Sequence, residues 1–131
     1  MKMLDTNICI HTIKHKTESV IKRFTAEIPN GLCISSITLA ELWHGVEKSS
    51  KPQKNAATLA KFLTAITILP FDDLAAIEYG NIYADLQKKG TPIGQMDMMI
   101  VAHARAEKLI LVTNNTRGFE RVVGLQLENW V

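Results

Sequence analysis

Short apolar runs in this chain alternate with longer segments in which apolar residues recur every three or four positions. Short runs of this kind predict buried strands, and the longer periodicity predicts amphipathic helices. A run of consecutive apolar residues also indicates a strand that is covered on both faces, as in a parallel sheet. The predicted strands are Met1–Leu4, Leu32–Ser35, Ile66–Leu69 and Leu109–Val112, with a weak edge strand at Leu125–Leu127.

The segments between these strands carry helix start and stop signals. The predicted helices are Asn7–Lys14, Glu18–Glu27, a helix capped by Ser36 that runs through Val46, Pro52–Ala65, Leu74–Lys89 after a cap at Asp73, Gln95–Lys108, and Arg117–Val122. Alternating strands and helices predict an α/β fold with a central parallel sheet of four to five strands flanked by helices. The 131 residues suit one domain with one hydrophobic core.

Composition narrows the class of protein without identifying it. Apolar residues make up 47% of the chain and charged residues 21%, and the net charge of +2 permits a nucleic-acid partner without specifying one. Cys9 and Cys33 lack the spacing of zinc ligands, so we expect two buried free thiols. Neither a signal peptide nor an apolar run long enough to cross a bilayer is evident, so we expect a cytoplasmic protein with no membrane partner.

Three acids stand at junctions between predicted elements. Asp5 follows the first strand directly, Glu41 lies early in a helix after the second strand, and Asp97 lies in the first turn of a later helix. The carboxyl ends of parallel strands share one edge of the sheet, which is where ligands of open α/β sheets bind. Carboxylates that converge there suit a hard divalent cation.

Each acid also has an ordinary structural interpretation. Asp5 is a suitable N-cap for the helix that follows it, and Glu41 fits a solvated helix face. Asp97 suits the positive end of its helix, but the flanking methionines predict an apolar setting in which a lone carboxylate is costly. His103 lies on a mostly apolar helix face, so we interpret it as a hydrogen-bonded packing residue and not as a base.

Several segments resemble the motifs of PIN-domain ribonucleases, in the same order and over nearly the whole chain. The closest subgroup is the VapC toxins of toxin–antitoxin modules, and this resemblance implies a single PIN-like nuclease domain over residues 1–131. The matching segments are Met3–Asn7, Ser35–Leu42, Gly94–Ala104, Leu111–Asn115 and Phe119–Val122, with Gly45–Ser49 and Glu128–Val131 matching the subgroup.

The resemblance implies a Mg²⁺- or Mn²⁺-dependent endoribonuclease that acts as a toxin on structured RNA, with tRNA as the leading substrate class. Asp5, Glu41 and Asp97 would form the acidic site, and Asp5 and Asp97 would bind the metal directly. The implied partners are a VapB-type antitoxin and a second copy of the chain, in a homodimer and a toxin–antitoxin hetero-oligomer. Leu42, Trp43 and Val46 are candidates either for the core or for an antitoxin groove.

The chain departs from the family pattern after its fourth strand. Many members carry a fourth acid there, whereas this chain has Asn115 and then Gly118 where an acid is expected, and Glu120 is the remaining acid nearby. An alternative is therefore a catalytically weakened RNA- or protein-binding PIN module. A second alternative is a phosphatase-like hydrolase, but such an enzyme would need an acid two residues after Asp5, where this chain has Asn7. Residues expected to support the site or to contact RNA are Thr6, Asn7, Thr113, Asn114, Arg117 and Glu120. Asn115 can coordinate the metal or orient a water. Further candidate phosphate contacts are Lys14, Lys16 and Arg105.

Overall fold

The five strands form one parallel sheet in a computed structural model that describes residues 1–131. The strand order is β3–β2–β1–β4–β5, so β1 lies at the centre and β3 and β5 form the edges. All four neighbouring pairs are parallel. The strands are β1 (Lys2–Leu4), β2 (Leu32–Ser35), β3 (Thr67–Leu69), β4 (Ile110–Val112) and β5 (Leu127–Glu128).

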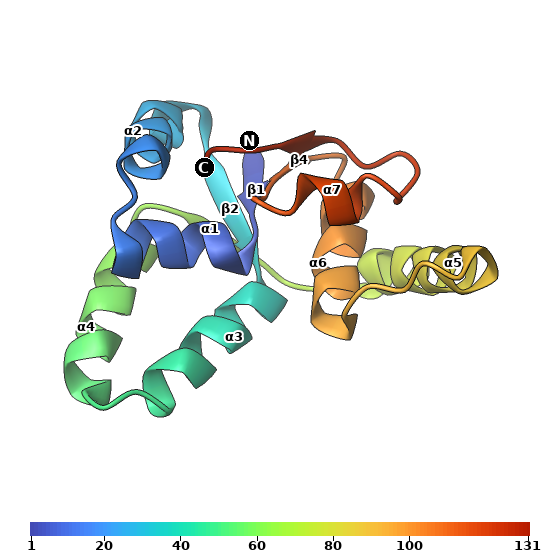
Figure 1. Ribbon diagram of the computed structural model, residues 1–131. Coiled ribbons are helices and arrows are strands. Elements are labelled where there is room, and N and C mark those ends of the chain that lie inside the picture. Colours follow the sequence, from blue (N-terminus) through green and yellow to red (C-terminus); the bar gives the residue numbers. More distant parts are fainter.

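Helices lie on both sides of this sheet (Figure 1). Helices α1 to α4 pack on one face, and helices α5 to α7 pack on the other. The helices are α1 (Thr6–Ile10), η1 (His11–His15, a π-helix), α2 (Glu18–Glu27), η2 (Ile28–Asn30, a 3₁₀ turn), α3 (Ser36–Glu47), α4 (Pro52–Leu63), α5 (Asp73–Lys89), α6 (Gln95–Ala106) and α7 (Thr116–Phe119). None of them is long and apolar enough to cross a bilayer.

The strands supply a core on each face of the sheet because successive side chains point to opposite sides. Met3 packs with the α5, α6 and α7 side chains, whereas Leu4 packs with those of α1 to α4. Both residues are fully buried. The short apolar runs therefore correspond to strands that are covered on both faces, as the sequence predicts.

Most predicted boundaries agree with the structure, and the exceptions have local causes. Ser35 caps α3 in place of Ser36, and Asp72 caps α5 in place of Asp73. A cap residue keeps extended backbone dihedrals while its side chain accepts a backbone N–H, and two adjacent candidates have the same composition signal. The weak strand lies at Leu127–Glu128, and its predicted edge position is confirmed.

The first helix does not continue regularly to Lys14. It changes to a π-helix at His11 and ends at Lys16, which adopts a left-handed conformation with φ 49°. The N–H of Thr17 donates to the carbonyl of His11 over 3.1 Å. Single π turns are rare, and many of them occur at functional sites.

Candidate functional site at the carboxyl edge of the sheet

Asp5 stands immediately after the central strand and beside Thr113. Leu4 and Val112 are register partners, and the N–H of Asp5 continues the ladder by donating to the carbonyl of Val112 over 3.0 Å. Asp5 is 5% exposed, and its Oδ1 accepts the N–H of Ile8 over 2.9 Å. Its interpretation as an N-cap is therefore confirmed, and one carboxylate oxygen remains for other partners.

Glu41 is held toward Asp5 by a hydroxyl from α1. Thr6 Oγ1 donates to Oε1 of Glu41 over 2.6 Å and lies 3.3 Å from Oγ1 of the buried Thr38. These contacts join the first turn of α1 to α3. Glu41 is half-buried, so it does not lie on a fully solvated helix face.

Asp97 reaches the same edge from the first turn of α6. The residue is exposed, so the predicted apolar setting is wrong. The cause is its helical position, which directs Met98 and Ile100 into the core and leaves Asp97 accessible. Deeper in α6, His103 Nδ1 lies 2.8 Å from Oγ of Ser35, which fixes α6 against the start of α3.

Burial and neighbouring carboxylates raise the pKa values of Asp5 and Asp97. Loss of solvent raises the pKa of Asp5 to about 6, and the nearby charges of Asp97 and Glu41 contribute to the increase, against hydrogen bonds from Thr113 and Ile8. The pKa of Asp97 is also raised, first by partial removal of solvent and then by Glu41. The structure thus brings the three predicted acids into one negatively charged site.

No cationic side chain compensates this charge. None of the chain's salt bridges involves Asp5, Glu41 or Asp97. The chain also has no group of three His, Cys, Asp or Glu side chains that encloses a metal position. Mg²⁺ keeps several waters and typically takes only one or two protein carboxylates. An unbalanced pair of Asp carboxylates beside Glu41 fits such an ion.

The segment after β4 takes a structural role. Asn115 caps α7, with Oδ1 accepting the N–H of Gly118 over 3.2 Å. Its own N–H donates to Oγ1 of Thr113 over 3.0 Å. Glu120 is exposed at the end of α7 and contributes to neither raised aspartate pKa. Arg117 is exposed on the same short helix.

Asn7 and Asn114 lie on the exposed surface beside the acids. Asn114 Nδ2 approaches Nε2 of His11 at 3.4 Å, so the loop after β4 meets the first turn of η1. Asn7 and His11 are one helical turn apart, and the N–H of His11 donates to the carbonyl of Asn7.

Two other predicted residues lie outside the site. His103 is fully buried, and burial lowers its pKa, so its interpretation as a packing residue is confirmed. The phosphate contact predicted for Arg105 is wrong, because its guanidinium bonds to Glu78 at 2.6 Å and Asn81 at 2.8 Å on α5. It also donates to the carbonyl of Val123. Arg105 therefore connects α6 to α5 and does not face the acids.

Known proteins are similar to this chain over nearly its whole length. The PIN domain family model matches residues 2–125. The chain belongs to the PIN-domain family, among its VapC ribonucleases. It is 52% identical over 128 residues to the tRNA(fMet)-specific endonuclease VapC of Shigella flexneri, covering 98% of this chain and 96% of that protein. It is 50% identical over 129 residues to Ribonuclease VapC2 of Haemophilus influenzae, with coverages of 98% and 97%.

Solved structures confirm the PIN-like fold. The crystal structure of VapBC2 from Rickettsia felis bound to a promoter DNA fragment contains a chain with a TM-score of 0.95 and 40% identity, over 99% of this chain and 98% of that one. DNA-bound VapBC from Salmonella typhimurium gives a TM-score of 0.94 and 47% identity over the full length of both chains. The resemblance recognised in the sequence is confirmed.

Two residues at the site of this PIN domain escape sequence reasoning. Thr38 lies three residues before Glu41, on the same helix face, and its hydroxyl meets Thr6. His11 lies one turn after Asn7 and meets Asn114. Helical spacing from a predicted site residue is the signal that could have found both.

Proposed function

We propose that this chain is the toxin of a VapB–VapC pair and that it hydrolyses RNA phosphodiesters with a bound Mg²⁺ or Mn²⁺. One observation carries the proposal: Asp5, Glu41 and Asp97 form an acidic site at the carboxyl edge of the sheet, and no Lys, Arg or His pairs with them. A bare cluster of this kind repels a phosphodiester. It suits RNA cleavage only when a cation reverses the local charge.

The residues have separable roles in this proposal. Asp5 and Asp97 would hold the ion, which supplies positive charge against the phosphate and lowers the pKa of a bound water. Glu41 is oriented by the hydroxyl of Thr6, so its carboxylate would orient the attacking water and accept its proton. Thr113 supports Asp5 from the end of β4.

Structured RNA is the proposed substrate, with tRNA as its leading class. The name of the Shigella flexneri relative specifies tRNA(fMet), and its 52% identity extends over nearly all of both chains. The site follows three strand ends on an exposed edge, where a folded RNA loop has access. The exposed Asn7 and Asn114 lie beside it.

The test is cleavage of a labelled RNA hairpin and of tRNA by the purified chain, with and without EDTA. Asp5→Asn and Asp97→Asn should each abolish cleavage while the variants stay folded. Asp73→Asn is the matched control, because Asp73 is an exposed acid in the first turn of α5. Cleavage that persists in EDTA or in clean Asp5→Asn would refute the metal assignment. Binding of RNA without any cleavage by the parent would instead support the catalytically weakened module.

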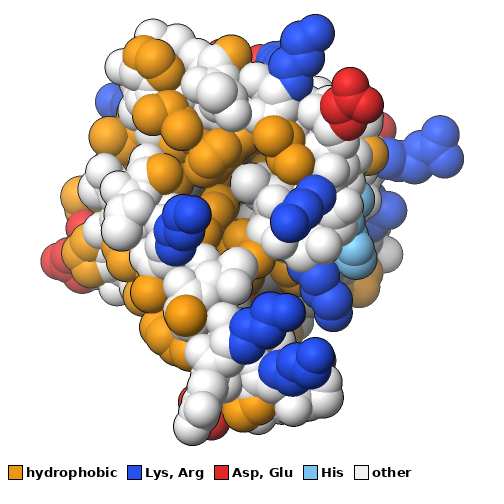
Figure 2. All heavy atoms as spheres, turned by 90° about the vertical axis from the view of Figure 1, so that its left-hand side faces the viewer, with side chains coloured by type: hydrophobic (Ala, Val, Ile, Leu, Met, Phe, Trp, Pro, Cys, Tyr) orange, Lys and Arg blue, Asp and Glu red, His pale blue; other side chains and the backbone are white.

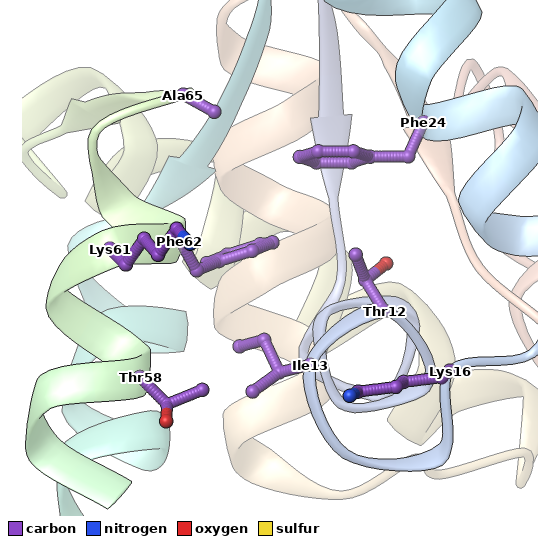
Figure 3. A pocket seen from close by; sticks show the side chains of 8 residues that line it. All are labelled: Thr12, Ile13, Lys16, Phe24, Thr58, Lys61, Phe62 and Ala65. Atoms are coloured by element: carbon purple, nitrogen blue, oxygen red, sulfur yellow. The ribbon is translucent and has the colours of Figure 1, made fainter.

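A VapB-type antitoxin is the proposed partner, and a hollow on the outer face provides a place for it. The hollow has a volume of about 380 Å³ and lies among η1, α2 and α4. Figure 2 shows hydrophobic side chains gathered on this face with Lys and Arg side chains around them. The rings of Phe24 and Phe62 stack with their centroids 5.5 Å apart. The two side chains point toward each other at the hollow, and Ile13 lies below them (Figure 3).

Of the two alternatives for the α3 residues, the core position holds for Leu42 and Val46, and the antitoxin groove stays open only for Trp43. Leu42 and Val46 are each 7% exposed and belong to the core, while Trp43 is 38% exposed. The hollow has a different chemistry, with an apolar floor and the side chains of Lys16 and Lys61 at its edge. It fits an apolar antitoxin segment that is flanked by acidic residues.

Charge reversal at the rim tests this surface. Lys61→Glu should weaken the antitoxin's affinity for the chain and its ability to relieve growth arrest, whereas Lys88→Glu on the distant α5 should not. Both lysines are exposed, so neither change disturbs the core. Equal antitoxin affinity for both variants would place the antitoxin elsewhere. Absence of growth arrest by a well-expressed, RNA-cleaving chain would refute the toxin function alone.

A further inference from the structure

Beside the acidic site, η1 and the loop after β4 place two imidazole rings and an amide together. His11 Nδ1 lies 2.8 Å from Oγ1 of Thr17, and its Nε2 lies 3.4 Å from Nδ2 of Asn114. One tautomer satisfies both contacts: Nδ1–H donates to Thr17, and Nε2 accepts from Asn114. The ring edge of His11 is therefore occupied, which leaves its face for other contacts.

His15 extends this cluster into solvent. Its ring centroid lies 5.4 Å from that of His11, with an interplanar angle of 62°. His15 and Asn114 are exposed, and His11 is half-buried. Both histidines belong to the π-helix, which ends at the left-handed Lys16. The result is a small aromatic surface with a free amide oxygen at one side.

The cluster of His11, His15 and Asn114 lies near Asp5, where we propose that the RNA is cleaved. Asn114 directly follows Thr113, whose hydroxyl interacts with Asp5. His11 is six residues after Asp5 on the same helical segment, which corresponds to about 9 Å along the axis. This separation is suitable for a nucleotide next to the cleaved bond. The exposed Lys14 and Lys16 on the same segment can contact the RNA backbone.

We infer that His11, His15 and Asn114 form a binding site for one unstacked nucleobase of the RNA next to the cleaved bond. The inference rests on the proposed ribonuclease function and adds a specificity-determining subsite to it. Unpaired RNA bases commonly stack on aromatic and histidine rings while amides bond their edges. The imidazole of His15 would stack on the base, His11 would hold Asn114 in place, and the carboxamide oxygen of Asn114 would accept a hydrogen bond from the base.

Binding is measured in the Asp5→Asn background, so that cleavage does not interfere, with a fluorescent RNA hairpin containing a single-stranded loop. His15→Ala should weaken binding roughly 5- to 150-fold, which is the range for losing one stacked base. His15→Phe keeps a ring and should retain most of the affinity. Asn114→Ala should weaken binding as well, while Gln87→Ala, an exposed amide at the far end of α5, should not.

Abasic RNAs isolate the stacking contact. Removing the base at one loop position should erase the difference in RNA affinity between the parent and His15→Ala, because the imidazole then has no base to contact. The salt dependence of binding should be the same for parent and His15→Ala, since no phosphate contact is lost. Equal His15→Ala effects on every abasic RNA would overturn the inference. So would unchanged RNA binding with weakened antitoxin binding, which would make the cluster part of the protein interface.

The two proposals fail in different ways. If base-dependent binding is found but the Asp5-containing parent cleaves no RNA with Mg²⁺ or Mn²⁺, the subsite stands and the nuclease function falls. If the parent cleaves RNA and the His15 and Asn114 variants match it in KM and kcat on all loop sequences, the nuclease function stands and the subsite falls.

Discussion

Thr6 and Glu41 are joined by a 2.6 Å hydrogen bond in which the Thr6 hydroxyl donates to Oε1 of the carboxylate. The bond connects the residue after Asp5 to the second turn of α3, so it sets the distance between two acids that come from different elements. The Oγ1 of Thr38 lies 3.3 Å from that of Thr6, and the shorter contact of the Thr6 hydroxyl is the one to Glu41.

Thr6→Val should lower kcat/KM for RNA by about 10- to 150-fold. Valine keeps the shape of threonine but removes the donor, and a hydrogen bond to a charged group contributes about 1.5–3 kcal/mol. Thr6→Ser keeps the hydroxyl and is the matched control. Single-turnover cleavage rates and melting curves are compared for the three proteins. Loss of activity in both variants, or in neither, would contradict a role for this hydrogen bond.

Asp5→Asn should stabilise the metal-free protein at neutral pH. The pKa of Asp5 is raised to about 6, so the folded state binds more protons than the unfolded state between about pH 4 and pH 6. Unfolding free energy therefore falls as pH rises through this window, by up to about 3 kcal/mol from this group. Asparagine carries no charge and keeps the oxygen that caps Ile8.

The measurement is denaturant unfolding in EDTA from pH 4 to pH 7.5. The advantage of Asp5→Asn over the parent should grow between pH 4 and pH 6 and then level off. Taking the difference between the two proteins is essential, because Glu27 has a pKa lowered by its hydrogen bond from Lys2 and contributes a slope of opposite sign. Asp5→Ala loses the cap as well and should be less stable than Asp5→Asn by about 1 kcal/mol. An advantage that does not change with pH would contradict a raised pKa at Asp5.

Added Mg²⁺ or Mn²⁺ should raise the Tm of the parent more at pH 7.5 than at pH 5. A metal that binds only the folded state stabilises it by mass action, and its carboxylate ligands must be ionised. Because Asp5 and Asp97 both have raised pKa values, protons compete with the metal below pH 6. Asp5→Asn and Asp97→Asn should each reduce the shift, whereas Asp73→Asn should leave it unchanged. A Tm that ignores millimolar metal at pH 7.5 would count against the metal site.

The sequence predicts this fold well because each strand is short and mostly apolar and each helix has clear breakers around it. Met3 and Leu4 show why, since burial on both faces favours apolar side chains at successive positions of β1. The boundaries that the sequence does not predict correctly depend on local backbone conformation and side-chain contacts. Ser35 and Ser36 are equally good caps by composition, and only the backbone dihedrals decide between them. The π-helix at His11 goes together with contacts from His11 to Thr17 and Asn114, which the spacing of apolar residues does not predict.

The acidic residues were predictable for a topological reason, and their surroundings were not. Parallel strands place Asp5 and Thr113 at one edge, so their neighbourhood follows from the alternation of elements alone. The accessibility of Asp97 depends on the rotation of α6, and the use of Arg105 depends on the packing of α5 against it. Both are tertiary properties that a single sequence leaves undetermined.

The side chain of Asn115, and not the backbone conformation, explains why position 118 is a glycine. Its φ is outside the left-handed region, so the backbone conformation does not require glycine there. A Cβ at position 118 would lie 2.7 Å from Nδ2 and 2.8 Å from Oδ1 of Asn115, which caps α7 through the N–H of Gly118. Any side chain at position 118 must therefore displace this cap.

Gly118→Ala should leave the stability of the parent nearly unchanged and should stabilise Asn115→Ala. In the parent, the loss of the cap costs about 1 kcal/mol and offsets the gain in helix propensity. In Asn115→Ala there is no cap to lose, so the propensity gain of up to about 1 kcal/mol remains. Denaturant unfolding of the four proteins of this cycle measures the interaction directly. The same effect of Gly118→Ala in both backgrounds would show that the two residues are independent.

The same pair determines whether position 118 belongs to the metal site. Gly118→Glu and Gly118→Ala displace Asn115 alike, so the difference between them reports only the added carboxylate. If the position of the missing family acid lies within reach of the ion, Gly118→Glu should need less Mg²⁺ than Gly118→Ala for half-maximal cleavage, because the site gains one negative charge. Metal titrations of RNA cleavage by both variants make the comparison. An identical metal requirement would exclude position 118, and the acids Asp5, Glu41 and Asp97 would then form the complete site.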